Sequence, residues 1–159
     1  MILFPSDGLW LSLLRRYMFW SAGLHLIWEI VQLPLFTLWR TGTAREITFA
    51  VLHCTAGDLM IAALALLVAL LLVGEATWPQ HGSIRVGVVM LTIGIGYTIY
   101  SEWVNTVVRQ SWAYAPIMPT LPWFGTGISP LLQWLVVPLF AMRLSNAFGS
   151  PRSRCGWAA

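Results

Sequence analysis

The sequence predicts an all-α, polytopic membrane protein: a bundle of four transmembrane helices with little other structure around it. Three observations lead to this fold class. Of the 159 residues, 58% are hydrophobic and 9% are charged, which is more apolar than a water-soluble domain of this length. Four apolar runs are each long enough to cross a bilayer. All nine basic residues are arginine, and the segments that join these runs share them unevenly.

The four runs divide the chain into a membrane domain, residues 17–144, and two terminal segments. The expected spans are residues 17–39, 47–73, 86–104 and 127–144. They are expected to be helical because a helix satisfies its backbone hydrogen bonds within itself, as lipid requires. Residues 1–16 are expected to form an interfacial segment and residues 145–159 a polar tail. Pro34 and Pro138 should kink the first and fourth helices.

The arginines predict the orientation of the bundle. The side with both termini and the second connecting segment carries Arg15, Arg16, Arg85, Arg143, Arg152 and Arg154, and the other side carries Arg40, Arg45 and Arg109. Because arginine is enriched in cytoplasmic segments, both termini are expected in the cytoplasm, at a bacterial inner membrane. The net charge of +3 is therefore read as an orientation signal, and no nucleic-acid partner is expected. The expected partners are the lipid bilayer and a second copy or another membrane subunit.

Five ionisable residues lie within the expected spans, where each costs about 2.5 kcal/mol or more near the bilayer centre. They are His25, Glu29, His53, Asp58 and Glu102. His25 and Glu29 are four residues apart and share a helix face. Counting from the outer ends of the first two helices places Glu29 and Asp58 at similar depth. These residues predict a polar chamber that opens to the outer side of the bundle.

The first hypothesis for this chamber is a divalent metal site, for zinc, copper or iron, used in binding or transport. Two imidazoles and three carboxylates on facing helices are suitable ligands, and helical bundles hold metals in this way. Each residue also has a structural alternative. Paired polar groups can join helices by hydrogen bonds, and Glu102 is near enough to Arg109 to form an ion pair that stabilises the outer segment.

The second hypothesis is acid–base chemistry on a sterol-like or lipid-like molecule. The four-span layout, the His25-x-x-x-Glu29 pair and the Trp134-x-x-x-Pro138 sequence resemble the emopamil-binding protein family of sterol isomerases and sigma-2-type receptors. The resemblance implies that His25 and Glu29 transfer a proton and that Trp134 stabilises a cation. The sequence departs from that family in two places: Asp58 stands where the family has a glutamate, and Gln133 precedes Trp134 directly, where the family has an asparagine about a turn earlier.

The third hypothesis is a non-catalytic subunit of a larger membrane complex, with the aromatic outer segment 105–126 as its docking surface. A second resemblance is compatible with any of the three. The strings WEIVQLP at residues 28–34, HCTAGD at 53–58 and SEW at 101–103 are similar to those of small bacterial four-span inner-membrane proteins.

Overall fold

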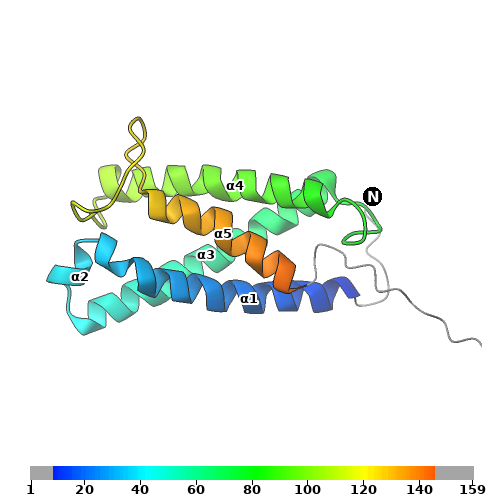
Figure 1. Ribbon diagram of the computed structural model, residues 1–159, viewed down its shortest axis with the longest axis horizontal. Coiled ribbons are helices and arrows are strands. Elements are labelled where there is room, and N and C mark those ends of the chain that lie inside the picture. The colour runs from blue at the N-terminus through cyan, green and yellow to red at the C-terminus, as the bar shows by residue number, and fades with distance from the viewer. Residues whose placement is uncertain (1–8, 146–159) are drawn as a thin grey trace, which may run out of the picture.

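The computed structural model describes residues 9–145, and this part of the chain is all-α, as expected. Its long helices are α1 (Leu9–Gln32), α3 (Ala44–Val73), α4 (Ser83–Trp103) and α5 (Ile128–Leu144). Three short helical turns accompany them: a 3-10 turn (Leu33–Leu35), α2 (Leu38–Thr41) and a π turn (Val104–Val108). The four long helices lie lengthwise beside one another in an elongated bundle (Figure 1).

The first helix differs most from its expected bounds. α1 already begins at Leu9, so the second half of the expected interfacial segment is continuous with it. Residues 1–8 of that segment, and residues 146–159 of the expected tail, lie outside the described residues. α1 ends at Gln32 because Pro34 has no backbone N–H to continue the helical ladder, and the chain turns into the 3-10 turn and α2. Pro138 lies buried inside α5.

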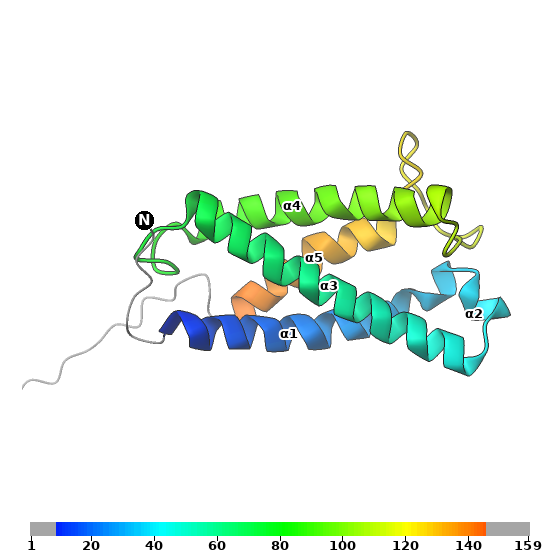
Figure 2. The same cartoon turned by 180° about the vertical axis from the view of Figure 1, so that it is seen from behind.

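The helices form a closed ring in which α1 packs on α3 and α5, and α4 packs on the same two helices. One end of the ring holds the start of α1, the α3–α4 connection and the end of α5; we call it the closed end (Figures 1 and 2). The opposite end holds α2 and residues 109–127; we call it the pocket end. The hydrophobic core combines small and medium side chains, among them Ala62, Ala65, Ala69, Met90 and Ala141, with the aromatic rings of Tyr17 and Trp78.

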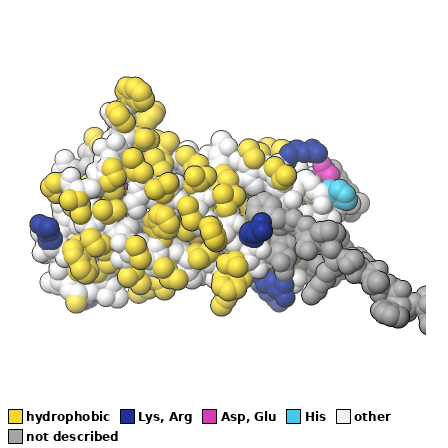
Figure 3. All heavy atoms as spheres, in the orientation of Figure 1, with side chains coloured by type: hydrophobic (Ala, Val, Ile, Leu, Met, Phe, Trp, Pro, Cys, Tyr) yellow, Lys and Arg dark blue, Asp and Glu magenta, His cyan; other side chains and the backbone are white. Residues whose placement is uncertain are grey.

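The outer surface of the bundle is apolar. Two segments, Ala44–Val73 and Ser83–Val108, are long and apolar enough to cross a membrane. Exposed hydrophobic side chains such as Phe19, Leu72 and Ile84 point away from the core. In Figure 3 hydrophobic side chains cover the middle of the visible face, and the basic side chains lie toward its ends. An apolar surface this extensive indicates contact with lipid or with another protein.

Residues 109–127 form an ordered cover over the pocket end. The backbone N–H of Thr37 donates to the carbonyl oxygen of Ala113 at 3.0 Å, and that of Ala115 donates to Leu35 at 2.9 Å. These two bonds join the cover to the chain between α1 and α3. The cover is therefore tied to the helices that carry the polar residues below it.

Candidate functional site

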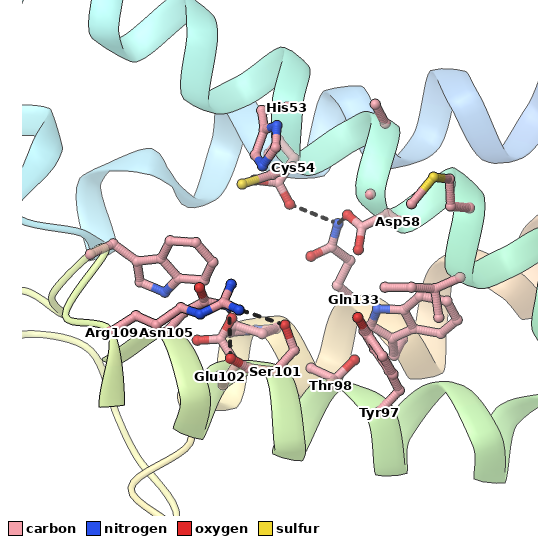
Figure 4. A pocket seen from close by; sticks show the side chains of 18 residues that line it. His53, Cys54, Asp58, Tyr97, Thr98, Ser101, Glu102, Asn105, Arg109 and Gln133 are labelled. Atoms are coloured by element: carbon pink, nitrogen blue, oxygen red, sulfur yellow. Dashed lines mark hydrogen bonds between the residues drawn. The ribbon is translucent and has the colours of Figure 1, made fainter. Parts of the chain in front are cut away.

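A pocket of about 470 Å³ lies at the pocket end and receives residues from all four long helices and from the cover (Figure 4). Its polar lining includes three carboxylates, and aromatic side chains form much of the rest. The main lining residues are Glu29, His53, Asp58, Tyr97, Thr98, Ser101, Glu102, Asn105, Arg109, Trp112, Gln133 and Trp134. The volume is within the usual range for small-molecule sites.

At the inner wall of the pocket, three polar groups converge on one atom. The Nε2 atom of Gln133 lies 3.0 Å from His25 Nδ1, 3.0 Å from Glu29 Oε1 and 2.9 Å from Asp58 Oδ2. His25 Nδ1 also lies 3.3 Å from Asp58 Oδ2. We call these four side chains the inner cluster. Helices α1, α3 and α5 therefore meet at a single amide group.

The inner cluster requires a proton beyond those of the amide. Gln133 Nε2 carries two hydrogens, yet it faces three groups that accept hydrogen bonds. The amide can donate to only two of these groups at once, and the third contact depends on a hydrogen carried by His25 or by a carboxyl group. Three side chains that are able to carry a proton therefore lie within hydrogen-bond distance of one amide.

Helix geometry explains how the inner cluster is positioned. His25 and Glu29 are one turn apart on α1, so both point toward α5. Gln32, on the next turn, donates to Glu29 Oε1 at 2.8 Å and accepts from the Ser129 hydroxyl of α5 at 2.8 Å. These bonds fix the end of α1 against the start of α5 and hold the Glu29 carboxylate in place. Such supporting bonds keep a polar site in one geometry.

Trp134 is placed between the pocket and the core. Its ring lies 5.7 Å from the ring of His25, centroid to centroid. A Cβ atom added at Gly94 would lie 2.1 Å from Trp134 Cε3, so only glycine at this position of α4 leaves room for the indole. The close approach of α4 and α5 thus depends on Gly94. Gly96 meets nothing within 4 Å of such an added atom and plays no part in this packing.

Glu102 belongs to a second polar group at the mouth of the pocket. The Tyr114 hydroxyl of the cover donates to Glu102 Oε2, and the backbone N–H of Gly127 donates to the same hydroxyl at 3.0 Å. Burial, followed by the charge of Glu102, raises the pKa of Tyr114 above its usual value. The tyrosine therefore stays protonated and keeps its bond to the carboxylate. The ion pair of Glu102 with Arg109 that the sequence allowed is replaced by this bond.

The five residues singled out in the sequence lie in three parts of the site: the inner cluster, the mouth and the edge of the pocket. His25, Glu29 and Asp58 are together in the inner cluster, and Glu102 is at the mouth. His53 is exposed at the edge, where its ring stacks on Phe49 at 5.4 Å. Across residues 9–145, no group of three or more His, Cys, Asp or Glu side chains is placed to hold a metal ion. The metal site stays a prediction from the sequence.

Two residues are more central than the sequence suggested. Gln133 is polar in an apolar helix, which marks it as unusual, but its position at the centre of the inner cluster depends on the rotation of α5. Tyr114 has the composition of an interfacial anchor, and its role as the partner of Glu102 depends on the path of the cover. Neither rotation nor path can be read from residue spacing.

Comparison with known proteins gives no relative from which a function could be assigned. No family model, no curated protein and no solved structure matches the chain.

Proposed function

We propose that the chain is a four-span membrane protein that binds a lipid-like molecule in its pocket and exchanges a proton with it through His25, Glu29 and Asp58. The observation that carries the proposal is the convergence of an imidazole and two carboxyl groups on Gln133, with Glu29 and Asp58 lining a pocket large enough for an organic ligand. Groups that give and take protons in catalysis must lie this close to one another and within reach of the ligand.

The four-span architecture is supported by the length and packing of the other two helices. α1 has 24 residues and packs on α3 and α5, and α5 has 17 residues and packs on α1 and α4. Arg15, Arg16, Arg85 and Arg143 belong to the closed end, where the long helices begin or end. On the positive-inside rule the closed end faces the cytoplasm of a bacterial inner membrane and the pocket faces outward.

The chemistry that suits the pocket is the shift of a carbon–carbon double bond. One group of the inner cluster gives a proton to one carbon of the bound molecule. Glu29 or Asp58 removes a proton from another carbon, and the electrons of that C–H bond form the new double bond. The proton lost and the proton gained balance, so no oxidant or reductant is needed. Trp134 supports the proposal because its ring can face a carbocation formed between the two steps.

The resemblance to the emopamil-binding protein family points to the same chemistry. His25, Glu29 and Trp134 are the residues that carry it, and they meet around the inner cluster with Asp58. Gln133 stands immediately before Trp134 on α5, where that family places an asparagine about a turn earlier. We propose that Gln133 orients the two carboxyl groups.

Deuterium transfer tests the proposal directly. The full chain is purified in detergent and incubated in D₂O with cholest-8-enol or with 3-dodecenoic acid, and mass spectrometry measures deuterium bound to carbon. We expect incorporation with at least one of these probes. Glu29→Gln and Asp58→Asn should each reduce its rate at least about a hundredfold, since each removes a proton carrier.

Glu75→Gln is the matched control. Glu75 is a partly exposed carboxylate that pairs with Arg85 outside the pocket, so its loss should leave the rate unchanged. Incorporation that is absent from the wild type, or equal in all variants, would overturn the proposal.

A further inference from the structure

Arg109 is a cation at the mouth of the pocket without an acidic partner. It lines the pocket together with Glu102, but the contacts between a basic side chain and a carboxylate found between residues 9 and 145 are His25–Asp58 and Glu75–Arg85. Glu102, the nearest candidate by sequence, is bound instead by Tyr114. What distinguishes Arg109 from the other exposed arginines is its place in the pocket lining, where its guanidinium is available to a negatively charged group.

The backbone before and after Arg109 is irregular in a way that directs it to the pocket. Val104–Val108 form a π turn, closed by the N–H of Arg109 at 2.7 Å from the carbonyl oxygen of Val104. The wider turn rotates the following residues relative to a regular α-helix, and such turns occur often at functional sites. Gln110 follows with φ = 54°, in the left-handed region that non-glycine residues seldom adopt.

The close view of the pocket shows where this backbone places Arg109 (Figure 4). Arg109 extends over the same side of the pocket as Asn105, Ser101 and Glu102 (Figure 4). Asn105 is itself held by a hydrogen bond from its Nδ2 to the carbonyl oxygen of Ser101 at 2.9 Å. The mouth therefore presents the Arg109 cation together with the neutral groups of Asn105 and Ser101 and the carboxylate of Glu102, which is bonded to Tyr114.

The two ends of the pocket differ in charge. The inner end holds the carboxyl groups of Glu29 and Asp58, whereas the mouth holds the guanidinium of Arg109 beside the Glu102 carboxylate, which already accepts a hydrogen bond from Tyr114. The lining also includes apolar and aromatic side chains, among them Ile61 and Trp134. A molecule that complements this lining has a negative head, an apolar body and a reactive carbon some distance from the head.

We infer that the ligand is an anionic amphiphile, with a phosphate or carboxylate head that Arg109 binds at the mouth and an apolar chain that reaches the inner cluster. A planar guanidinium suits both heads because it can donate two parallel hydrogen bonds to their oxygens. This inference rests on the proposed function, because it names the substrate class of the same pocket.

Binding of matched amphiphiles tests the inference. The full chain is reconstituted in phosphatidylcholine nanodiscs, and equilibrium binding of radiolabelled probes is measured with protein-free discs as the blank. The probes share a twelve-carbon chain and differ only in the head: dodecyl phosphate, dodecanoate, dodecanol and dodecyltrimethylammonium. We expect the two anionic probes to bind about tenfold or more tightly than the other two.

Two arginine variants separate a specific contact from general charge. Arg109→Gln should remove the preference for the anionic heads, and Arg109→Lys should retain part of it because lysine keeps the charge but not the planar fork. Arg40→Gln is the matched control, since Arg40 is an exposed arginine of α2 outside the pocket. Anionic probes that bind no better than dodecanol, or that bind Arg109→Gln as well as the wild type, would overturn the inference.

The same assay distinguishes the two sources of such a head and separates this inference from the proposed function. If the head belongs to a membrane lipid, discs of phosphatidylglycerol should abolish dodecyl phosphate binding; if it belongs to a free molecule, binding should persist there. If deuterium incorporation depends on Glu29 and Asp58 but anionic heads are not preferred, only the inference is overturned. Absence of both activities would overturn both.

Discussion

The two halves of this bundle are built from the same four helices but use different side chains. Toward the closed end, alanines of α3 pack against Met90 and Ala141 with almost no exposed surface. At the pocket end, three carboxyl groups, a histidine and two glutamines occupy the equivalent positions between the helices. Closely packed apolar contacts give stability, whereas buried polar groups cost free energy unless they are bonded. One half therefore supplies closely packed apolar contacts, and the other half carries the polar groups of the candidate site.

Shortening a buried side chain at the closed end should produce the largest loss of stability. Met90 is fully buried and accepts a hydrogen bond at its Sδ atom from the Tyr17 hydroxyl. Met90→Ala should lower the free energy of unfolding by about 2–5 kcal/mol, the usual cost of removing a buried methionine. Denaturant titration in mixed micelles measures the change. Val88→Ala, at an exposed site of the same helix, should cost far less, and equal losses in both variants would contradict the contrast.

A smaller loss of stability is expected from a substitution where the closed half and the pocket half meet. Gly94→Ala forces a methyl group against the Trp134 ring, which should cost about 1–3 kcal/mol of unfolding free energy. Gly96→Ala, two residues away on the same helix, enters open space and should cost nothing. Thermal unfolding of the two variants in one detergent compares them directly. Equal midpoints would show that α4 and α5 do not depend on this close approach.

The sequence predicts the helices better than it predicts their environment. Long apolar runs place the starts of α3, α4 and α5 within three residues of the observed ones, because an apolar run without charges or helix breakers usually forms one continuous helix. α1 starts earlier than expected because Arg15 and Arg16 mark a charge boundary and not a helix end.

For the candidate site residues too, the sequence predicts the position on a helix better than it predicts the contacts. The spacing of His25 and Glu29 and the depth of Asp58 bring three of the five residues together. His53 lines the edge of the pocket and stacks on Phe49 of its own helix, and it makes no bond to the inner cluster. Glu102 bonds to Tyr114 because residues 109–127 fold back over the pocket, and no local pattern specifies that path.

Removing the hydrogen bond between Tyr114 and Glu102 should change the stability least, and the size of the change should depend on pH. Tyr114→Phe removes a donor to a buried carboxylate and should cost about 1 kcal/mol near neutral pH. Because the pKa of Tyr114 in the folded protein is raised above the ordinary 10.0, its contribution is complete below pH 10 and declines as the pH rises toward the folded value. Unfolding midpoints of wild type and variant should therefore converge in strongly alkaline buffer. A constant gap between them would contradict the assignment.

The central claim is that the inner cluster serves proton transfer and does not merely join the helices. The most direct measurement takes one preparation of Asp58→Asn and determines both its unfolding midpoint and its deuterium incorporation in D₂O. We expect the midpoint to stay nearly the same, because asparagine has almost the same shape and its side-chain oxygen can still accept the hydrogen bond from Gln133, while incorporation is lost. A midpoint that falls sharply while the remaining folded protein still transfers deuterium would contradict the claim and identify the cluster as structural.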